Sequence, residues 1–259
     1  MPEMIEVEYY RRVAERTVGR TIAKVHADDS WYLKAGTTAK ALRAALTGAT
    51  ITGTDRIGKL LLLDTDTVRV GLRFGMTGRL LVDGAGPIEK LEYSSGRHEP
   101  AWTRFALAFR GGGTLEMVDP RRLGGVELEP SLDRMGPDAM ALTKAQLRAA
   151  LVGVRAPLKA WLLDQSKVAG VGNLLADETL WQASLDPTRA GGTLAQDEVD
   201  GLHKQLRKTI TTLTKRGGSH TGELQVARVR GSSCPRDGVP LKRQEVGGRT
   251  TYWCPVHQV

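Results

Sequence analysis

The sequence predicts an α+β protein with an N-terminal β-sandwich domain flanked by helices and a helical C-terminal domain. Short β-type runs separated by glycine and aspartate fill the chain up to about residue 128. Helical periodicity dominates from about residue 129. The segment from about residue 223 onward is basic, glycine-rich and strand-like, and it holds both cysteines. We therefore expect three parts, residues 2–128, 129–222 and 223–259.

The N-terminal part begins with a predicted helix from Pro2 to Gly19, in which apolar residues recur among charges before a terminating glycine. A second short helix is predicted over Thr38–Leu46. The predicted strands are Thr21–His26, Ala49–Asp55, Lys59–Asp64, Val68–Phe74, Arg79–Val82, Arg104–Phe109 and Thr114–Val118. The run Arg110-Gly-Gly-Gly113 predicts a hairpin turn between the last two.

The second part carries helical periodicity in separate segments. The predicted helices are Thr143–Val152, Leu158–Asp164, Asn173–Gln182 and Gln196–Leu213. Thr143 and Gln146 have the spacing of a capping box, and Pro157 suits the first turn of a helix. The final part, from Val226 onward, is predicted to be strand-like.

Composition limits the class of protein. Hydrophobic residues make up 41% of the 259, which argues against a disordered chain. The 37 Lys and Arg outnumber the 29 Asp and Glu, and this basic balance favours a polyanionic partner, although many soluble proteins are also basic. The longest apolar runs, such as Leu60–Leu63, are too short for a bilayer, and the N-terminus lacks a secretory pattern. We expect an intracellular, cytoplasmic protein without a membrane partner.

The turn from Gln165 to Asn173 has the composition of a phosphate-binding turn. Two glycines stand beside Asn173 at a predicted helix start, where backbone N–H groups are exposed, and Lys167 is nearby. An ordinary interhelical turn can have the same composition. Spacing alone leaves both interpretations open.

The two cysteines lie in segments with metal-ligand spacing. Cys234 and Asp237, like Cys254 and His257, enclose two residues, and sixteen residues separate the pairs. All four side chains can bind Zn²⁺, although a carboxylate is less common in a structural site. A metal-free hairpin is the alternative. A disulfide is also possible, but an intracellular chain favours reduced thiols.

An ordered set of motifs resembles the formamidopyrimidine-DNA glycosylase/endonuclease VIII family. The segments Leu163–Gln165, Ala169–Asn173, Ala176–Glu178 and Asp186–Pro187 resemble its helix–two-turn–helix. The start, Met1-Pro-Glu-Met-Ile-Glu-Val-Glu8, resembles the family's N-terminus. Arg56–Lys59, Gly75–Gly78 and Asp119–Gly124 resemble motifs of its strand domain, and Gly248-Arg249 before Cys254 resembles its C-terminal finger. The resemblance therefore spans residues 2–258.

The resemblance implies that Pro2 is a nucleophile once Met1 is removed. Its terminal secondary amine is less basic than a lysine side chain. It would attack the anomeric carbon, expel the damaged base and leave an iminium that permits β,δ-elimination. Glu3 would act as general acid and base, and Glu6, one turn further along the same helix, would share that work. Without the resemblance, Pro2 would be interpreted as a rigid N-terminus and the acidic turn as a complement to the helix dipole.

The resemblance also implies DNA contacts. Lys59 would be the β-turn lysine that contacts phosphate and assists proton transfer, and Arg249 would contact the phosphate beside the lesion. Met76, Arg121 and Leu123 would fill the space vacated by a flipped nucleotide. Lys159 and Asn173 are further predicted DNA contacts.

The chain departs from the family pattern at several positions. Leu123 stands where the family commonly has Phe, and Met4-Ile5 replaces Leu-Pro. Asp237 and His257 replace two of four finger cysteines, yet we still expect a structural zinc on Cys234, Asp237, Cys254 and His257. The connection 217–226 is short compared with relatives that cap 8-oxoguanine. We therefore expect oxidised pyrimidines, ring-opened purines or abasic sites to be better substrates than 8-oxoguanine.

Together these features predict a bifunctional DNA glycosylase and abasic-site lyase of base-excision repair. We expect a monomer, nucleoid-associated in a bacterium, that holds damaged double-stranded DNA in a basic cleft between its domains and needs no organic cofactor. The alternative is a damage-recognising DNA-binding protein of the same fold without glycosylase activity. An RNA-binding or ribosomal protein would fit the charge but not the motifs.

Overall fold

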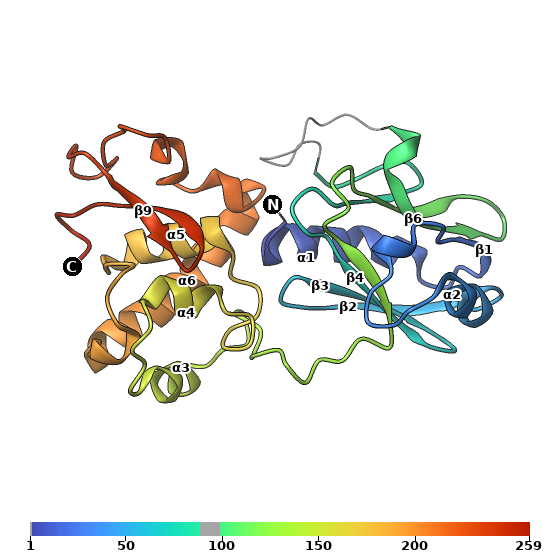
Figure 1. Ribbon diagram of the computed structural model, residues 1–259, viewed down its shortest axis with the longest axis horizontal. Coiled ribbons are helices and arrows are strands. Elements are labelled where there is room, and N and C mark those ends of the chain that lie inside the picture. Colours follow the sequence, from blue (N-terminus) through green and yellow to red (C-terminus); the bar gives the residue numbers. More distant parts are fainter. Residues whose placement is uncertain (1, 89–98) are drawn as a thin grey trace. The chain divides into compact units, whose positions relative to one another are not determined.

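The computed structural model describes residues 2–88 and 99–259. The chain divides into two compact units, residues 1–132 and 133–259 (Figure 1). In the part of the chain that the structure describes, unit 1 contains the two four-stranded sheets, and unit 2 contains most of the helices and a two-stranded C-terminal hairpin. No helix in the described part of the chain has the length and apolar character needed to cross a bilayer.

Within its described residues, unit 1 is a sandwich of two four-stranded sheets whose paired strands are all antiparallel. One sheet has the order β1-β6-β7-β5, formed by Ile22–His26, Thr103–Phe109, Thr114–Val118 and Arg79–Val82. The other has the order β2-β3-β4-β8, formed by Ile51–Ile57, Leu60–Thr65, Arg69–Arg73 and Gly125–Leu128. Leu61 and Leu63 from one sheet and Leu107 and Leu115 from the other share one buried core. The predicted β-sandwich is confirmed.

Helices α1 and α2 contribute to this core. Helix α1 (Met4–Ala14) buries Val7, Tyr10 and Ala14, whose spacing places them on one face. Helix α2 (Ala39–Leu46) buries Leu42 and Leu46. Short 3₁₀ turns lie at Glu15–Thr17 (η1), Ser30–Tyr32 (η2) and Pro100–Trp102 (η3). The predicted first helix therefore ends earlier than Gly19, because a 3₁₀ turn follows Ala14.

Strand β8 was not predicted from the sequence. It pairs with β4, placing Gly125 opposite Arg73 and Val126 opposite Leu72. Glycine is disfavoured in strands, so the short Gly-Val-Glu-Leu run carries a weak local signal. Pairing with β4 supplies the backbone hydrogen bonds that make this segment a strand.

Unit 2 contains α3 (Lys144–Leu151), α4 (Leu158–Leu163), α5 (Asn173–Ala183) and α6 (Gln196–Arg216), with 3₁₀ turns η4 (Gly191–Thr193), η5 (Ser219–Thr221) and η6 (Gln225–Ala227). The predicted capping box of Thr143 and Gln146 is present at α3. Pro157 is the N-cap of α4 and so lies one residue before the predicted first turn. Helix α5 is buried over most of its surface, which makes it the centre of the unit.

The chain ends in a hairpin of β9 (Lys242–Val246) and β10 (Arg249–Trp253). Gly247 and Gly248 form its turn, with φ of +60° and +70°. Two positive φ angles are what a two-residue type I′ hairpin turn requires, and glycine adopts them at no steric cost. The predicted strand-like C-terminal part is therefore a β-hairpin packed within unit 2.

Candidate functional site

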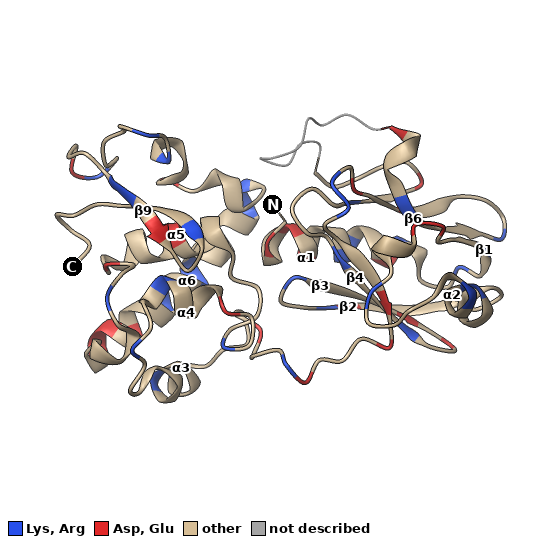
Figure 2. Cartoon of the chain, in the orientation of Figure 1, with Lys and Arg blue, Asp and Glu red and all other residues tan. Residues whose placement is uncertain are grey.

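The start of α1 holds two buried acidic side chains directly after Pro2. Glu3 is the N-cap of the helix, and its backbone N–H donates to the Glu6 carboxylate at 2.8 Å. Glu3 is fully buried and Glu6 is 3% exposed. Figure 2 shows this acidic start of α1. Two carboxyl groups are thus held close in the chain to the predicted nucleophile.

Lys59 lies in the turn of the β2–β3 hairpin. Ile57 pairs with Leu60, so Gly58 and Lys59 form the turn, and Gly58 has a φ of +55°. The Arg56 guanidinium donates to the Gly58 carbonyl at 2.8 Å and also pairs with Glu8 of α1 at 3.4 Å. These bonds tie the turn to the helix that follows Pro2.

Two loops of unit 1 bring the predicted void-filling residues together. Asp119, which is fully buried, accepts a hydrogen bond from the Thr77 hydroxyl at 2.6 Å. It also accepts from the backbone N–H of Gly124 at 2.8 Å. A Cβ at Gly75 would overlap the Leu123 backbone, so the two loops pack directly on one another. The side chain of Leu123 remains 49% exposed.

In unit 2, Gln165 organises the turn before α5. Its side-chain amide donates to the carbonyls of Leu163 at 2.9 Å and Val171 at 3.0 Å, and its oxygen accepts from the Gly170 N–H at 2.9 Å. One side chain therefore closes the turn. Gln165 lies in a segment that resembles the helix–two-turn–helix of the family, but the sequence alone predicted no role for its side chain.

Asn173 is the first residue of α5 and follows the N-cap Gly172. Its side-chain oxygen is buried and has no hydrogen-bond partner among the described residues. A helix N-terminus combines backbone N–H groups with the positive end of the dipole, which favours anions. This geometry suits the predicted phosphate contact.

The prediction that Lys159 contacts DNA does not agree with the structure. Its side chain is fully buried and pairs with Asp177 at 2.6 Å. Its ammonium also donates to the Thr251 hydroxyl at 2.7 Å, and Arg228 pairs with Asp177 at 3.0 Å. Burial raises the pKa of Asp177, while Lys159 and Arg228 oppose that rise. Lys159 thus anchors β10 to the helices.

Sequence reasoning missed Asp177 and Arg228, although a signal was present. Asp177 stands within the otherwise largely apolar run that starts at Asn173. A buried acid needs a cationic partner, because an unpaired buried charge is strongly unfavourable.

Arg249 is the first residue of β10 and is exposed. A Cβ at Gly247 would lie 3.0 Å from the Ala160 Cα, so the hairpin turn packs closely on α4. The Lys159 ammonium also donates to the Thr250 carbonyl at 3.3 Å. These contacts fix the backbone from which Arg249 projects.

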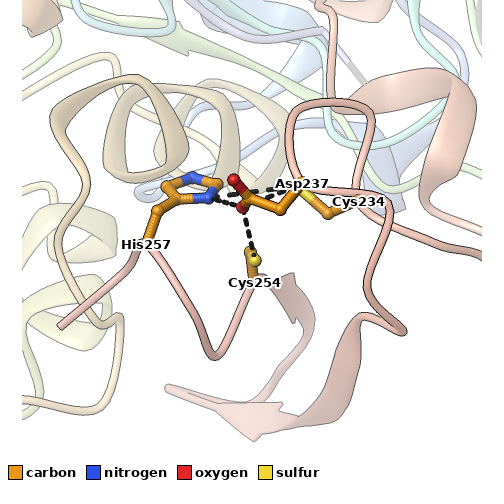
Figure 3. A group of neighbouring side chains, drawn as sticks. All are labelled: Cys234, Asp237, Cys254 and His257. Atoms are coloured by element: carbon orange, nitrogen blue, oxygen red, sulfur yellow. Dashed lines mark hydrogen bonds and ion pairs between the residues drawn. The ribbon is translucent and has the colours of Figure 1, made fainter.

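The four predicted metal ligands converge (Figure 3). Their donor atoms all lie within 4.8 Å of one another. The Asp237 carboxylate accepts from the Cys254 thiol at 2.9 Å and contacts His257 Nδ1. Hydrogen bonds from Cys254 and His257 lower the pKa of Asp237. Convergence of two sulfur, one oxygen and one nitrogen donor fits four-coordinate zinc.

The surroundings of these ligands also suit a metal centre. The Trp181 indole N–H and the Arg236 backbone N–H both donate to the Cys234 sulfur at 3.4 Å. Burial and the neighbouring Asp237 raise the pKa of the Cys254 thiol. Hydrogen bonds to ligand atoms are typical of the residues that surround a bound metal.

Comparison with known proteins identifies the family. Models of the formamidopyrimidine-DNA glycosylase N-terminal domain and H2TH domain match residues 1–126 and 135–224. The chain belongs to the formamidopyrimidine-DNA glycosylase family. The predicted family, enzyme class and fold are therefore confirmed, and the chain is a DNA glycosylase of base-excision repair.

Individual relatives agree with this membership. The enzymes of Geobacillus kaustophilus and Paracoccus denitrificans are 32% and 33% identical, over 98% and 100% of both chains. A Lactococcus lactis Fpg bound to DNA with an abasic site superposes with a TM-score of 0.84 at 28% identity over both whole chains. A complex of the same protein with DNA containing an oxidised pyrimidine has a TM-score of 0.82 at 29% identity, covering 99% of each chain.

The predicted site residues divide between the units. Unit 1 carries Pro2, Glu3, Lys59, Met76, Arg121 and Leu123. Unit 2 carries Lys159, Asn173, Cys234, Asp237, Arg249, Cys254 and His257. Asp119 and Thr77, which connect the two loops of unit 1, were missed as site residues because their contact joins segments distant in sequence.

Proposed function

We propose that this glycosylase is bifunctional and that Pro2 is its nucleophile. The supporting observation is the pair of buried carboxyl groups, Glu3 and Glu6, at the helix start that follows Pro2. A protein that only binds damage needs neither a terminal amine nor a buried acid beside it. The rival function, recognition without cleavage, leaves this arrangement without a purpose.

The proposed reaction proceeds through a Schiff base. The Pro2 nitrogen bonds to the sugar C1′ and loses its own proton, and the bond from C1′ to the base breaks with protonation of the base. Glu3 gives a proton to the ring oxygen as the sugar opens, which leaves an iminium between Pro2 and C1′. Loss of a C2′ proton sends electrons into the iminium and expels the 3′-phosphate. Loss of a C4′ proton then drives a second elimination that releases the 5′-phosphate, and water hydrolyses the iminium, which frees Pro2 and leaves the sugar fragment as an aldehyde.

Lys59, Asn173 and Arg249 are proposed phosphate contacts. Lys59 lies in a hairpin turn, Asn173 at a helix start and Arg249 at the start of a hairpin strand. Hydrogen bonds of neighbouring residues hold the backbone at the Lys59 turn and beside Arg249. Met76, Arg121 and Leu123 are proposed to fill the vacated space. Phosphate contacts fix the register of the protein on the duplex and carry no sequence information.

Cys234, Asp237, Cys254 and His257 are proposed to hold one structural zinc ion. Bound zinc would supply folding energy to the segment around the hairpin and would take no part in bond cleavage. We also propose that the protein acts as a monomer and is associated with the nucleoid of a bacterium.

The proposed lesion preference follows from the short connection after α6. Ser219–Thr221 forms a single 3₁₀ turn, and Ser219 is buried. The N–H of Leu224 already donates to the Glu178 carboxylate at 2.9 Å. We propose that this connection gives few contacts to 8-oxoguanine and that other oxidised bases are preferred.

Borohydride trapping on an abasic duplex tests the nucleophile. We expect a covalent adduct at Pro2 that is largely lost in Pro2→Gly and in protein with a blocked N-terminus. An undamaged duplex is the negative control. An undiminished adduct in both altered proteins would remove Pro2 from this role. Tight binding of native protein to lesion DNA, without adduct or cleavage, would favour the rival function.

A further inference from the structure

We infer that Asp119 is a positioning residue. It joins two loops, residues 75–78 with Met76 and residues 119–124 with Arg121 and Leu123, into one preformed wedge. The inference rests on the proposed function, since it takes Met76, Arg121 and Leu123 to be the residues that enter the duplex. It goes further by assigning the order of that wedge to a buried carboxylate that does not itself touch DNA.

Both oxygens of Asp119 are used, and they bond to both loops. Oδ1 accepts from the Thr77 hydroxyl at 2.6 Å and from the Arg121 N–H at 3.2 Å. Oδ2 accepts from the Gly124 N–H at 2.8 Å. The donors are thus the neighbour of Met76, one void filler itself and the neighbour of Leu123. A fully buried carboxylate with three donors is held firmly in one geometry.

The backbone around this carboxylate has little freedom. The Gly78 N–H donates to the Phe74 carbonyl at 2.8 Å, closing the turn that carries Met76. The Tyr10 hydroxyl donates to the Gly78 carbonyl at 3.4 Å, which connects this turn to α1. These bonds hold the backbone of the loops, while the side chains of Leu123 and Arg121 stay exposed.

A second anchor holds the far side of the loop. Arg122 has a φ of +56°, a conformation that few non-glycine residues adopt. Its guanidinium forms two hydrogen bonds to Asp29, at 2.6 and 2.8 Å. Arg121 and Leu123 therefore leave the loop on either side of an anchored residue.

Preorganisation should matter for duplex DNA and not for single-stranded DNA. Insertion into a duplex must replace a flipped nucleotide and its stacking, so loops that become ordered only on binding lose affinity. A single strand has no opposing base and presents its abasic site without extrusion. We call the hydrogen bonds from Thr77, Arg121 and Gly124 to Asp119 the clamp. Loss of a bond in this clamp should therefore lower cleavage of the duplex more than cleavage of the single strand.

Thr77→Val tests the clamp, because it removes the hydroxyl donor and preserves the side-chain shape. Abasic-site cleavage is measured on duplex and single-stranded DNA of the same sequence, with native protein, Thr77→Val, Thr77→Ser and Asp119→Asn. We expect Thr77→Val to lower kcat/KM on the duplex by about tenfold, the effect of losing one buried hydrogen bond. The single-strand rate should stay within about twofold, and Thr77→Ser should behave like native protein.

A second readout follows the wedge directly. A 2-aminopurine placed opposite the abasic site reports on stacking. Its fluorescence should rise less when Thr77→Val is added than when native protein is added, because the loops of the variant separate that base from its neighbours less completely. Equal loss on both substrates, or no loss on either, would overturn the inference. Absence of cleavage by native protein on both substrates would instead defeat the proposed function. If Asp119→Asn fails to fold, Thr77→Val still decides the question.

Discussion

Lys159 and Asp177 form an ion pair of 2.6 Å in which neither side chain is exposed to solvent. Arg228 supplies a second cation to the same carboxylate at 3.0 Å. The backbone N–H of Tyr252 also faces it at 3.5 Å. This network connects α4, α5, the segment after η6 and β10, which is the strand that begins with Arg249.

Asp177→Asn should destabilise the protein strongly, because it leaves two cations in the interior without their counter-charge. We expect a loss of about 3–5 kcal/mol in the free energy of unfolding. Lys159→Met should cost less, since Arg228 still neutralises Asp177 and Met fills similar volume. Urea denaturation measures both. The control is Arg43→Met, which breaks a solvent-exposed pair with Asp28 and should cost under about 1 kcal/mol. A loss in Asp177→Asn no larger than the control would contradict this account.

Asn173→Ala should weaken binding to all duplexes by a similar factor, because a phosphate contact is independent of sequence. Affinity of native protein should also fall steeply with salt, since several Lys and Arg neutralise phosphates. Fluorescence anisotropy with damaged and undamaged duplexes measures both effects. Ser184→Ala, at the opposite end of α5, is the matched control and should bind normally. A salt-independent affinity, or a loss confined to one DNA sequence, would argue against a phosphate contact at α5.

Purified protein should contain about one zinc per chain, the number that one tetrahedral site holds. Cys254→Ser should lose the metal and lower the thermal stability of the protein. Asp237→Cys should retain zinc more firmly against a chelator, because a thiolate replaces a carboxylate. Elemental analysis and chelator competition provide the measurements. Native protein without metal, whose activity and stability a chelator leaves unchanged, would establish a metal-free hairpin.

Excision of 8-oxoguanine should be slow compared with oxidised pyrimidines, ring-opened purines or abasic-site cleavage. Ser219, His220 and Thr221 offer few donors to a flipped purine, and the Thr221 hydroxyl already bonds to the Gly218 carbonyl. One or two hydrogen bonds contribute about 1 kcal/mol each, too little for strong selectivity. Single-turnover rates on matched duplexes measure the preference. A faster rate on 8-oxoguanine opposite cytosine would show that other residues recognise this base.

Glu198 should make the stability of unit 2 depend on pH in the acidic range. A double hydrogen bond from Arg189, with both distances 2.6 Å, lowers the pKa of Glu198 below its ordinary value of 4.5. A lowered folded-state pKa stabilises the fold above the unfolded pKa, and the contribution is lost as pH falls through the folded pKa. Glu198→Gln should therefore lower Tm by a few degrees at about pH 6 and by less at about pH 3. Asp197→Asn is the control at the adjacent position. A Tm difference that does not shrink on acidification would contradict the assignment.

Sequence alone determined the division into a sandwich and a helical part, and also the family. Strand alternation, helical periodicity and the turn glycines are local signals, so they survive without knowledge of the fold. The ordered motifs and the spacing of Cys234, Asp237, Cys254 and His257 are equally visible in one dimension. Their convergence within 4.8 Å agrees with that spacing.

Tertiary structure decided the environment of the charged residues and showed that Asp119 joins two loops of unit 1. Lys159 and Asp177 are separated in sequence, and only helix packing shows that they meet in the interior and not at a DNA surface. Asp119 likewise accepts a hydrogen bond from Thr77, which lies in a different loop of the chain. Strand β8 exists because β4 offers it an edge. Burial and hydrogen bonding of this kind depend on segments brought together by folding, and the free energy of a charge depends on those surroundings more than on its own identity.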